Sequence, residues 1–136
     1  MAWGLVFMAL LLIGFVAYRV REPGLRRSAT RAQTTSYTTI GKQLFSANCA
    51  QCHGNAGTGG GSAPTLNSSQ FLKSTSNQQI IALVSGGVSG TAMPAWGINY
   101  GGTFTDEQIL QVATYLRSLE PTAPSVPGWR QGAKAK

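Results

Sequence analysis

Two cysteines and a histidine lie within five consecutive residues, in the run Cys49-Ala50-Gln51-Cys52-His53. They are the only cysteines and the only histidine among the 136 residues. The spacing C-x-x-C-H is the attachment signature of a c-type haem. In that chemistry each thiol forms a thioether with one vinyl group of the porphyrin, and the histidine that follows is held beneath the iron as its proximal ligand. The motif therefore predicts one covalently bound haem c.

Other chemistries use the same residue types, and each makes a further demand on the sequence. A structural zinc site takes four ligands, commonly as two Cys/His pairs, and this chain offers three, all between Cys49 and His53. A thioredoxin-like redox pair is expected near a strand–helix–strand pattern, which the sequence does not show. An incidental surface C-x-x-C is the third alternative, and the residues around the motif bear on it.

A second axial ligand for the iron can be sought by elimination. With one histidine, a bis-histidine pair within the chain is excluded, and a methionine thioether is the remaining soft donor. The three methionines are Met1, Met8 and Met93, and the first two lie in an apolar N-terminal run that cannot reach the haem. Met93 follows a small, glycine-rich stretch, residues 85–92, which lets backbone approach a ring closely. Core packing is the alternative role for a lone methionine.

Three helices are expected to position these residues. The first runs from about residue 39 into the motif, with Ile40, Leu44 and Phe45 at helical spacing. The second begins at Ser76 with Gln79, and the last at Thr105 with Gln108, because both pairs have the spacing of a capping box. The last helix has one apolar face, made of Ile109, Val112, Leu116 and Leu119. These apolar residues are expected to pack as a core that keeps water from the iron.

With these residues in view, the chain from residue 40 to 119 resembles a class I, mono-haem cytochrome c of bacterial type. The matching landmarks are Gly41, Phe45, Gly54, Ala63-Pro64-Thr65-Leu66, Met93-Pro94-Ala95-Trp96 and Tyr115-Leu116-Arg117-Ser118-Leu119. The resemblance implies an all-α cytochrome c fold around one haem, and an electron carrier rather than an enzyme by itself. It also implies that the first helix crosses the last where Gly41 and Phe45 meet Tyr115.

The resemblance also assigns site residues. It puts the axial methionine at the M-P-A-W position, so that Met93 and His53 are the predicted iron ligands, a pair that raises the reduction potential. In similar cytochromes the carbonyl of the proline in A-P-x-L accepts the other ring N–H of the histidine. That proline maps to Pro64, for which a simple turn is the alternative role. Trp96 and Tyr100 are predicted contacts of the haem edge or propionates, although packing aromatics would look the same.

The N-terminal run predicts an uncleaved transmembrane anchor. Residues 1–18 contain no charge and would span about 27 Å as a helix, enough for a thin bilayer core. Trp3 and Tyr18 lie near the two ends, where interfacial aromatics are found. A cleaved signal peptide is the alternative, but the run has no basic n-region and no clear small-x-small site near its end.

The arginines that follow the anchor oppose the topology that the haem requires. No Lys or Arg precedes the anchor, and five arginines follow it: Arg19, Arg21, Arg26, Arg27 and Arg31. By the positive-inside rule, this distribution would leave the rest of the chain in the cytoplasm. Haem attachment to C-x-x-C-H resembles a process completed outside the bacterial cytoplasmic membrane. We expect the requirement for haem attachment to determine the topology, so that the haem domain lies on the periplasmic side. The arginines are then expected to contact lipid headgroups or acidic neighbouring subunits.

The formal net charge of +7 is unevenly distributed. It falls on residues 19–31 and on the C-terminal residues Arg130, Lys134 and Lys136, whereas residues 37–120 are neutral overall. A nucleic-acid interface, the usual suspicion for a basic chain, is therefore not expected. The neutral domain also lacks the lysine ring of a freely diffusing, electrostatically steered cytochrome.

These observations divide the chain into four parts: an anchor at 1–20, a basic Ser/Thr-rich linker at 21–36, a cytochrome c domain at 37–120 and an extended Pro-rich basic tail at 121–136. If flexible, the roughly eighteen residues from Arg19 to Ser36 span only about 23 Å, which is short for shuttling. Neighbouring subunits are expected to hold both linker and tail. We predict a resident electron-transfer subunit that resembles the mono-haem subunits of the quinol-oxidising assembly called alternative complex III, partnered by other subunits, redox proteins and the bilayer. The alternatives are a membrane-anchored cytochrome that serves or forms part of a terminal oxidase, and a haem sensor or enzyme with an open iron site.

Overall fold

The structure is a computed structural model that describes residues 2–60 and 63–131. Within those residues it contains helices and no strand, with one isolated bridge between Gly97 and Phe104. The all-α fold predicted from the sequence is therefore confirmed. The chain divides into two compact units, Met1–Thr35 and Ser36–Lys136, and each is described by itself.

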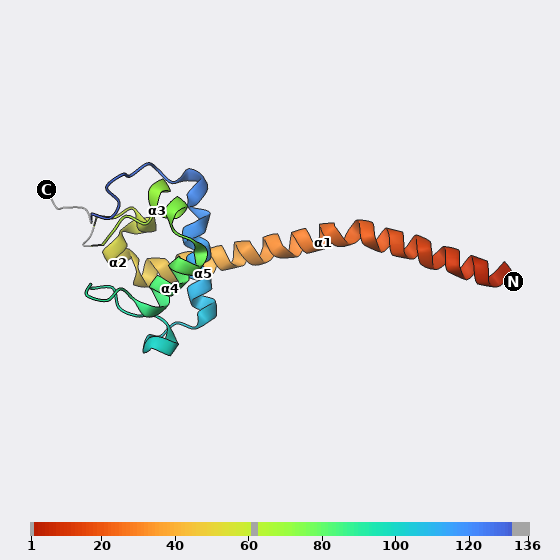
Figure 1. The fold of residues 1–136 in the computed structure, drawn as a ribbon, viewed down its shortest axis with the longest axis horizontal. Helices are drawn as coiled ribbons and strands as arrows, with labels where there is room; N and C mark the ends of the chain where they lie inside the picture. The colour runs from red at the N-terminus through yellow and green to blue at the C-terminus, as the bar shows by residue number, and fades with distance from the viewer. Residues whose placement is uncertain (1, 61–62, 132–136) are drawn as a thin grey trace. The chain divides into compact units, whose positions relative to one another are not determined.

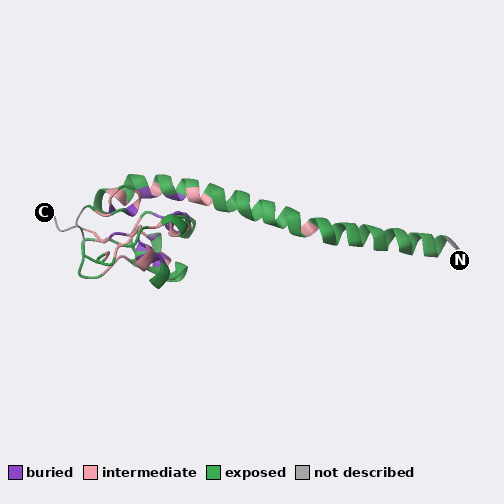
Figure 2. Ribbon diagram, turned by 90° about the horizontal axis from the view of Figure 1, so that it is seen from above, coloured by how far each residue is buried: buried purple, intermediate pink, exposed green. Residues whose placement is uncertain are grey.

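Helix α1, Ala2–Asn48, supplies all of the described residues of the first unit and the start of the second. In the first unit its residues 3–21 are all exposed, as the green ribbon in Figure 2 shows. Among the described residues this is the helix that is long and apolar enough to cross a membrane. Nothing in the unit covers its apolar side chains, which is the pattern of a helix whose surroundings are lipid.

The segment predicted as a linker, residues 21–36, is helical and continues α1. Three local features favour the helix. Arg26 donates to Glu22 one turn earlier, and the hydroxyls of Thr30 and Thr34 bond to the carbonyls four residues before them, at 2.9 Å each. The threonine hydroxyls thus find hydrogen-bond acceptors on the helix backbone and do not interrupt the helix. Pro23 lies inside the helix, where it cannot donate to the preceding turn.

The second unit places short helices around the C-x-x-C-H motif (Figure 1). In chain order they are α2 Ala50–His53, the 3₁₀ turn η1 Asn55–Gly57, α3 Ser69–Ser74, α4 Asn77–Gly86, η2 Ile98–Tyr100, α5 Asp106–Ser118 and η3 Glu120–Thr122. Both predicted capping boxes are confirmed. The hydroxyl of Ser76 accepts from the Gln79 N–H at the start of α4, and the hydroxyl of Thr105 accepts from the Gln108 N–H at the start of α5.

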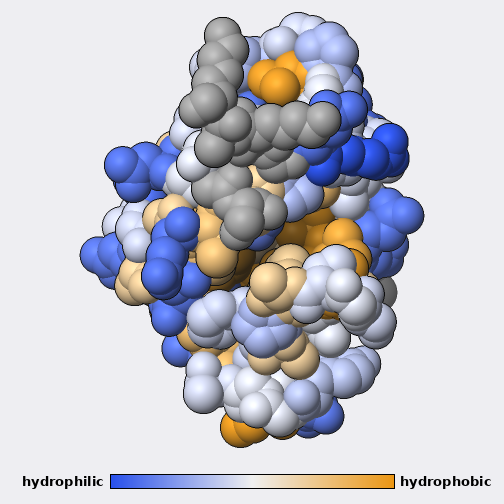
Figure 3. All heavy atoms as spheres, turned by 90° about the vertical axis from the view of Figure 1, so that its left-hand side faces the viewer, coloured by the Kyte–Doolittle hydropathy of each residue, from blue (hydrophilic) through white to orange (hydrophobic). Residues whose placement is uncertain are grey.

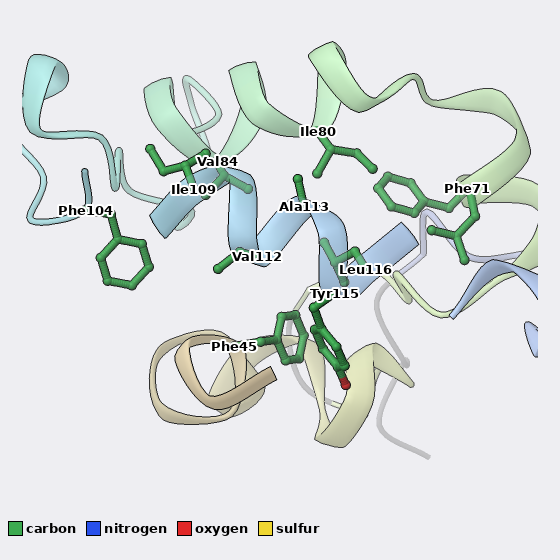
Figure 4. Close-up of a cluster of buried hydrophobic side chains, with 11 residues drawn as sticks. Phe45, Phe71, Ile80, Val84, Phe104, Ile109, Val112, Ala113, Tyr115 and Leu116 are labelled. Atoms are coloured by element: carbon green, nitrogen blue, oxygen red, sulfur yellow. The ribbon is translucent and has the colours of Figure 1, made fainter. Parts of the chain in front are cut away.

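Helix α5 is the centre of the core, because it packs against α4 on one side and the end of α1 on the other. In Figure 4, Ile80 and Val84 of α4 point toward α5, and the rings of Phe45 and Tyr115 face each other on its opposite side. Those two rings are tilted by 55° with their centroids 5.5 Å apart, an arrangement that aromatic pairs favour. Ile109 of α5 is fully buried.

Gly41 lets α1 and α5 approach closely, as the resemblance implied. A Cβ at Gly41 would lie 1.9 Å from the carbonyl oxygen of Gln111 and 3.0 Å from the Cβ of Tyr115. No side chain fits in that space, so the helix crossing requires glycine at this position. The contact brings Phe45 and the following motif against the face of α5 that carries Tyr115.

Arg117 joins the ends of three helices, a role that the sequence did not reveal. Its guanidinium donates to the carbonyls of Leu72 in α3 and Thr75 after it, and to the side-chain oxygen of Asn77 at the start of α4. It also pairs with Glu120 at 2.9 Å. Since three of these partners lie forty or more residues away, Arg117 fixes how α3 and α4 sit against the end of α5.

The predicted tail, residues 121–136, begins with the 3₁₀ turn η3 rather than with extended chain. Beyond it, described residues of the tail bond to the cytochrome unit itself: the Pro124 carbonyl accepts from Ser69, and the Trp129 carbonyl accepts from Thr65, both at 2.9 Å. The domain itself therefore holds the described part of this segment, and a contact of the tail with neighbouring subunits stays a prediction. Lys134 and Lys136 lie outside the described residues.

Candidate functional site: the haem-attachment motif and its cavity

The two thiols and the imidazole come from one turn of backbone. Helix α1 ends at Asn48, Cys49 keeps helical dihedral angles as the N-cap of α2, and the N–H of His53 bonds to the Cys49 carbonyl at 3.0 Å. Cys52 is exposed, Cys49 is half-buried and His53 is only 8% exposed. The helical turn therefore presents two sulfurs and one ring nitrogen to the same region.

The ring of His53 is oriented by a single hydrogen bond. Its Nδ1 lies 2.9 Å from the carbonyl oxygen of Pro64. Because a carbonyl can only accept, Nδ1 carries a proton and donates, which in a neutral imidazole leaves the lone pair on Nε2. A metal-binding histidine takes this form, with the outer nitrogen held by a carbonyl and the inner one free for the metal. Pro64 lies where the resemblance placed it.

The loop after the motif folds back tightly over His53. Gly54 has a φ of 77°, in the region that favours glycine, and a Cβ there would lie 1.9 Å from the Gly59 carbonyl oxygen. The N–H of Gly59 in turn donates to the His53 carbonyl at 2.7 Å. This turn returns the chain toward Pro64, so the glycine after the motif is needed to bring the accepting carbonyl to the imidazole.

One cavity of about 490 Å³ brings all six predicted site residues together. Its walls include Cys49, Cys52, His53, Pro64, Met93 and Trp96, and the rest of its surface is mostly apolar. Figure 3 shows hydrophobic residues gathered in a hollow on this face of the molecule. Its size falls within the roughly 300–1,000 Å³ of protein sites for organic ligands. Tyr100, predicted with Trp96 as a haem-edge contact, does not line the cavity and is 66% exposed.

The loop that carries Met93 is fixed by its own hydrogen bonds. The Met93 carbonyl accepts from the N–H of Val88 at 3.2 Å, its N–H donates to the hydroxyl of Thr91 at 3.2 Å, and the N–H of Trp96 donates to the Val84 carbonyl at 3.1 Å. These bonds tie the loop to the end of α4. The half-buried Met93 side chain reaches the cavity from this loop, whereas His53 reaches it from α2.

Burial, and to a lesser extent the neighbouring Cys52, raises the pKa of the Cys49 thiol to about 11. The unattached Cys49 is therefore protonated at neutral pH and is a weak nucleophile. Catalytic and redox cysteines have lowered pKa values, because the thiolate is the reactive form. This environment opposes thiol–disulfide catalysis at the C-x-x-C pair and suits a sulfur that ends in an uncharged thioether.

The donor set also fits a haem better than a bare metal ion. Among residues 2–60 and 63–131, no three or more His, Cys, Asp and Glu side chains gather as a metal site. The cavity instead offers one imidazole, one thioether and two thiols within apolar walls, which is the set of groups that a c-type haem takes from its protein.

Several residues of the cavity wall were not predicted from the sequence. Phe71 of α3, and Trp129 and Arg130 of the C-terminal segment, line it as well. Trp129 packs on Phe71 with ring centroids 5.1 Å apart. In the sequence, Trp129 and Arg130 are simply an aromatic residue and a cation that follow the prolines of the tail. That pattern does not indicate that the tail packs against the domain.

A known protein family matches most of this unit. Residues 37–116 match the family described as cytochrome c oxidase, cbb3-type, subunit III. The chain belongs to this family of c-type cytochromes. The cytochrome therefore binds haem c, and its apolar N-terminal helix makes it a membrane protein. No solved structure matches it.

The relatives of the cytochrome include subunits of one kind of oxidase. It is 37% identical over 97 residues to the cbb3-type cytochrome c oxidase subunit FixP of Sinorhizobium medicae, which covers 65% of this chain and 32% of the relative. It is 36% identical over 80 residues to subunit CcoP of Rubrivivax gelatinosus, covering 59% and 25%. It is also 38% identical over 80 residues to cytochrome c6 of Tetradesmus obliquus, covering 57% and 84%.

The cytochrome spans about a third of the length of the FixP relative and a quarter of that of CcoP. The relatives that carry an assembly in their names are subunits of an oxidase, and none of those described here belongs to a quinol-oxidising complex. The comparisons therefore give no support to the predicted alternative complex III type, and they favour the terminal-oxidase alternative.

Proposed function

We propose that this cytochrome passes single electrons through one haem c, bound by thioethers from Cys49 and Cys52, with His53 and Met93 as axial ligands. The observation that carries the proposal is the cavity in which these four side chains meet, together with the His53 ring held at Nδ1 by Pro64. When bound, the haem supplies the Fe(III)/Fe(II) couple.

The protein's part is to hold, orient and shield that group. The Pro64 carbonyl fixes the His53 ring and strengthens it as a donor. The apolar walls, which include Phe45, Val112 and Leu116, exclude water and favour the less charged reduced iron. With Met93 and His53 both as ligands, the methionine sulfur would shift the reduction potential in the same direction.

An electron carrier fits the cavity better than an enzyme or an open-site sensor. No carboxylate lines it among the described residues, so His53 has no partner there for acid–base catalysis, and its Nδ1 proton is already donated to Pro64. Met93 reaches the cavity from the loop after α4, and as a ligand it would fill the position that a gas-binding site leaves open.

For the host assembly we propose a terminal oxidase, in which the cytochrome receives electrons from a donor and delivers them toward the oxygen-reducing subunit. Support comes from its relatives FixP and CcoP, which are subunits of cbb3-type cytochrome c oxidases. The α1 apolar run would hold it in the bacterial cytoplasmic membrane among those subunits. We place the haem unit on the periplasmic side because of its C-x-x-C-H motif, despite the arginines at 19–31.

Spectroscopy of the full chain, matured with haem in its own membranes, tests the electron-carrier role. We expect a pyridine haemochrome of the bis-thioether type and a low-spin, six-coordinate reduced spectrum that carbon monoxide does not change. A five-coordinate reduced spectrum that responds to carbon monoxide would instead establish a sensor or an open-site enzyme.

Copurification tests the host assembly. An affinity tag on the full chain, expressed in its native host and extracted in mild detergent, should retain an oxygen-reducing oxidase subunit. Recovery of the cytochrome with quinol-oxidising subunits and no oxidase would overturn the proposed assembly. Protease treatment of intact spheroplasts tests the topology and should digest the haem unit. If the haem unit is digested only after the membrane is opened, it lies on the cytoplasmic side and the proposed topology is wrong.

A further inference from the structure

The C-terminal segment, residues 123–131, lies beyond the residues matched to the family, which end at 116. Figure 1 shows it in blue, running from the end of α5 back past α3. Four hydrogen bonds to residues 65–70 of the domain hold it. The N–H groups of Ser69 and Thr65 donate to the carbonyls of Pro124 and Trp129. The Gln70 side chain accepts from the Val126 N–H and donates to the Ser125 hydroxyl. The segment is thus attached along its length to the loop and helix beside the cavity.

Trp129 supports the His53 side of the cavity. Its carbonyl accepts from Thr65, the residue after the Pro64 carbonyl that orients the imidazole. Its half-buried ring packs on Phe71, and both rings line the cavity. The tryptophan therefore closes part of the wall and buttresses the loop that holds His53.

Arg130 brings a positive charge to this wall. Its guanidinium lies over the Trp129 ring, 4.6 Å from the centroid, and the residue lines the cavity. Of the described lining residues it is the only one with a permanent charge, since no Lys, Asp or Glu is among them. The stacking on Trp129 keeps the planar group at the edge of the cavity while it remains in contact with solvent.

A haem carries two propionate carboxylates, and no other permanently charged side chain of the described lining balances them. Placing an ionised carboxylate against apolar walls is costly unless it is paired or hydrated. A guanidinium pairs with a carboxylate through two parallel hydrogen bonds and stays charged at every relevant pH. Within the described part of the wall, Arg130 supplies that group.

We infer that residues 123–131 form a strap that completes the haem site, in which Trp129 covers the His53 side and Arg130 pairs with a haem propionate. The inference rests on the proposed function, because it requires a bound haem. A cation beside the propionate destabilises Fe(III) more than Fe(II), since the oxidised centre carries the additional positive charge. Arg130 therefore raises the reduction potential.

Redox titration of the haem-loaded full chain in mild detergent at low salt tests the pair. We expect Arg130→Gln to lower the midpoint potential and Arg130→Lys to restore most of it. Lys73→Gln, which removes an exposed charge of α3 away from the cavity, should leave the potential nearly unchanged. A shift in Arg130→Gln no larger than that in Lys73→Gln would overturn the pairing.

Limited proteolysis of the same haem-loaded chain tests the strap. Trp129→Ala should make the segment after residue 122 more rapidly cleaved than in the wild type, and Trp129→Phe, which keeps an aromatic ring on Phe71, should protect it. Equal cleavage rates in all three proteins would overturn the strap. These outcomes differ from a failure of the proposed function. The proposed function fails only if the wild-type protein itself carries no covalent, six-coordinate haem.

Discussion

Substitution of Gly41 by alanine tests whether the crossing of α1 and α5 holds the haem unit together. The added Cβ would lie 1.9 Å from the Gln111 carbonyl oxygen and 3.0 Å from the Tyr115 Cβ. A backbone carbonyl cannot rotate away as a flexible side chain can, so the two helices must separate by about 1 Å. That separation would loosen the ring contact between Phe45 and Tyr115.

The cost can be placed between two opposing effects. Overpacking a core by a methyl group costs about 1–3 kcal/mol, and more where the obstacle is backbone. Replacing glycine by alanine inside a helix returns about 1 kcal/mol. Because the clash is with backbone, we expect Gly41→Ala to lower the free energy of unfolding by about 2–3 kcal/mol. At an m-value of about 1–2 kcal/mol/M, the urea midpoint falls by about 1–3 M.

The assay is urea unfolding of the haem-loaded protein, followed by the loss of the methionine–iron charge-transfer band and by circular dichroism. Gly86→Ala is the matched control, because Gly86 is the last residue of α4 and a Cβ there meets nothing within 4 Å. We expect the control to be as stable as the wild type or slightly more stable. If Gly41→Ala unfolds at the same urea concentration as Gly86→Ala, the close crossing does not support the fold.

Three further perturbations have defined outcomes. Arg117→Met leaves the Leu72 and Thr75 carbonyls and Asn77 without their donor. It should lower the free energy of unfolding in urea by about 2–4 kcal/mol, whereas Lys73→Met should change that free energy little. Equal stability of the two variants would show that Arg117 does not organise the three helix ends. The double variant Cys49→Ala with Cys52→Ala should lose covalent haem and cooperative unfolding, because a domain this small is marginal without the added apolar surface; a haem-free variant with a sharp thermal transition would contradict this. Thr105→Ala removes the hydroxyl that accepts from Gln108 and should cost about 1 kcal/mol, and an unchanged melting temperature would mean that the cap does not stabilise α5.

Local patterns predicted the parts of the fold that depend on local interactions. The capping boxes at Ser76 and Thr105 pair residues three apart in the chain, so their spacing alone predicted where α4 and α5 begin. The C-x-x-C-H motif is equally local, since one helical turn brings its three side chains together. The Gly41 contact came from the family resemblance, because nothing in its neighbours specifies which helix it faces.

The interactions missed from the sequence join residues far apart in the chain. The sequence analysis gave Arg117 no role of its own, yet two of its bonds go to backbone carbonyls of residues more than forty positions away. Carbonyls have no sequence signature, so such bonds cannot be predicted from residue types. The same reason hid Trp129, whose carbonyl accepts from the backbone of Thr65.

The helical state of residues 21–36 was missed for a different reason. The serines, threonines and basic residues of this stretch suggested a linker. The threonine hydroxyls instead bond within the helix, and Glu22 pairs with Arg26. The composition alone therefore indicated a linker, whereas the interactions between residues four apart favour a helix.

The most direct test of the account is the midpoint potential and absorbance of Met93→Ala and Met93→His in the haem-loaded full chain. If the sulfur of Met93 is the sixth ligand, the alanine variant loses the methionine–iron charge-transfer band, becomes sensitive to carbon monoxide and shifts to a lower potential. The histidine variant should remain low-spin, with a potential also below that of the wild type. An alanine variant with the band, the carbon monoxide response and the potential of the wild type would show that the iron is not held between His53 and Met93.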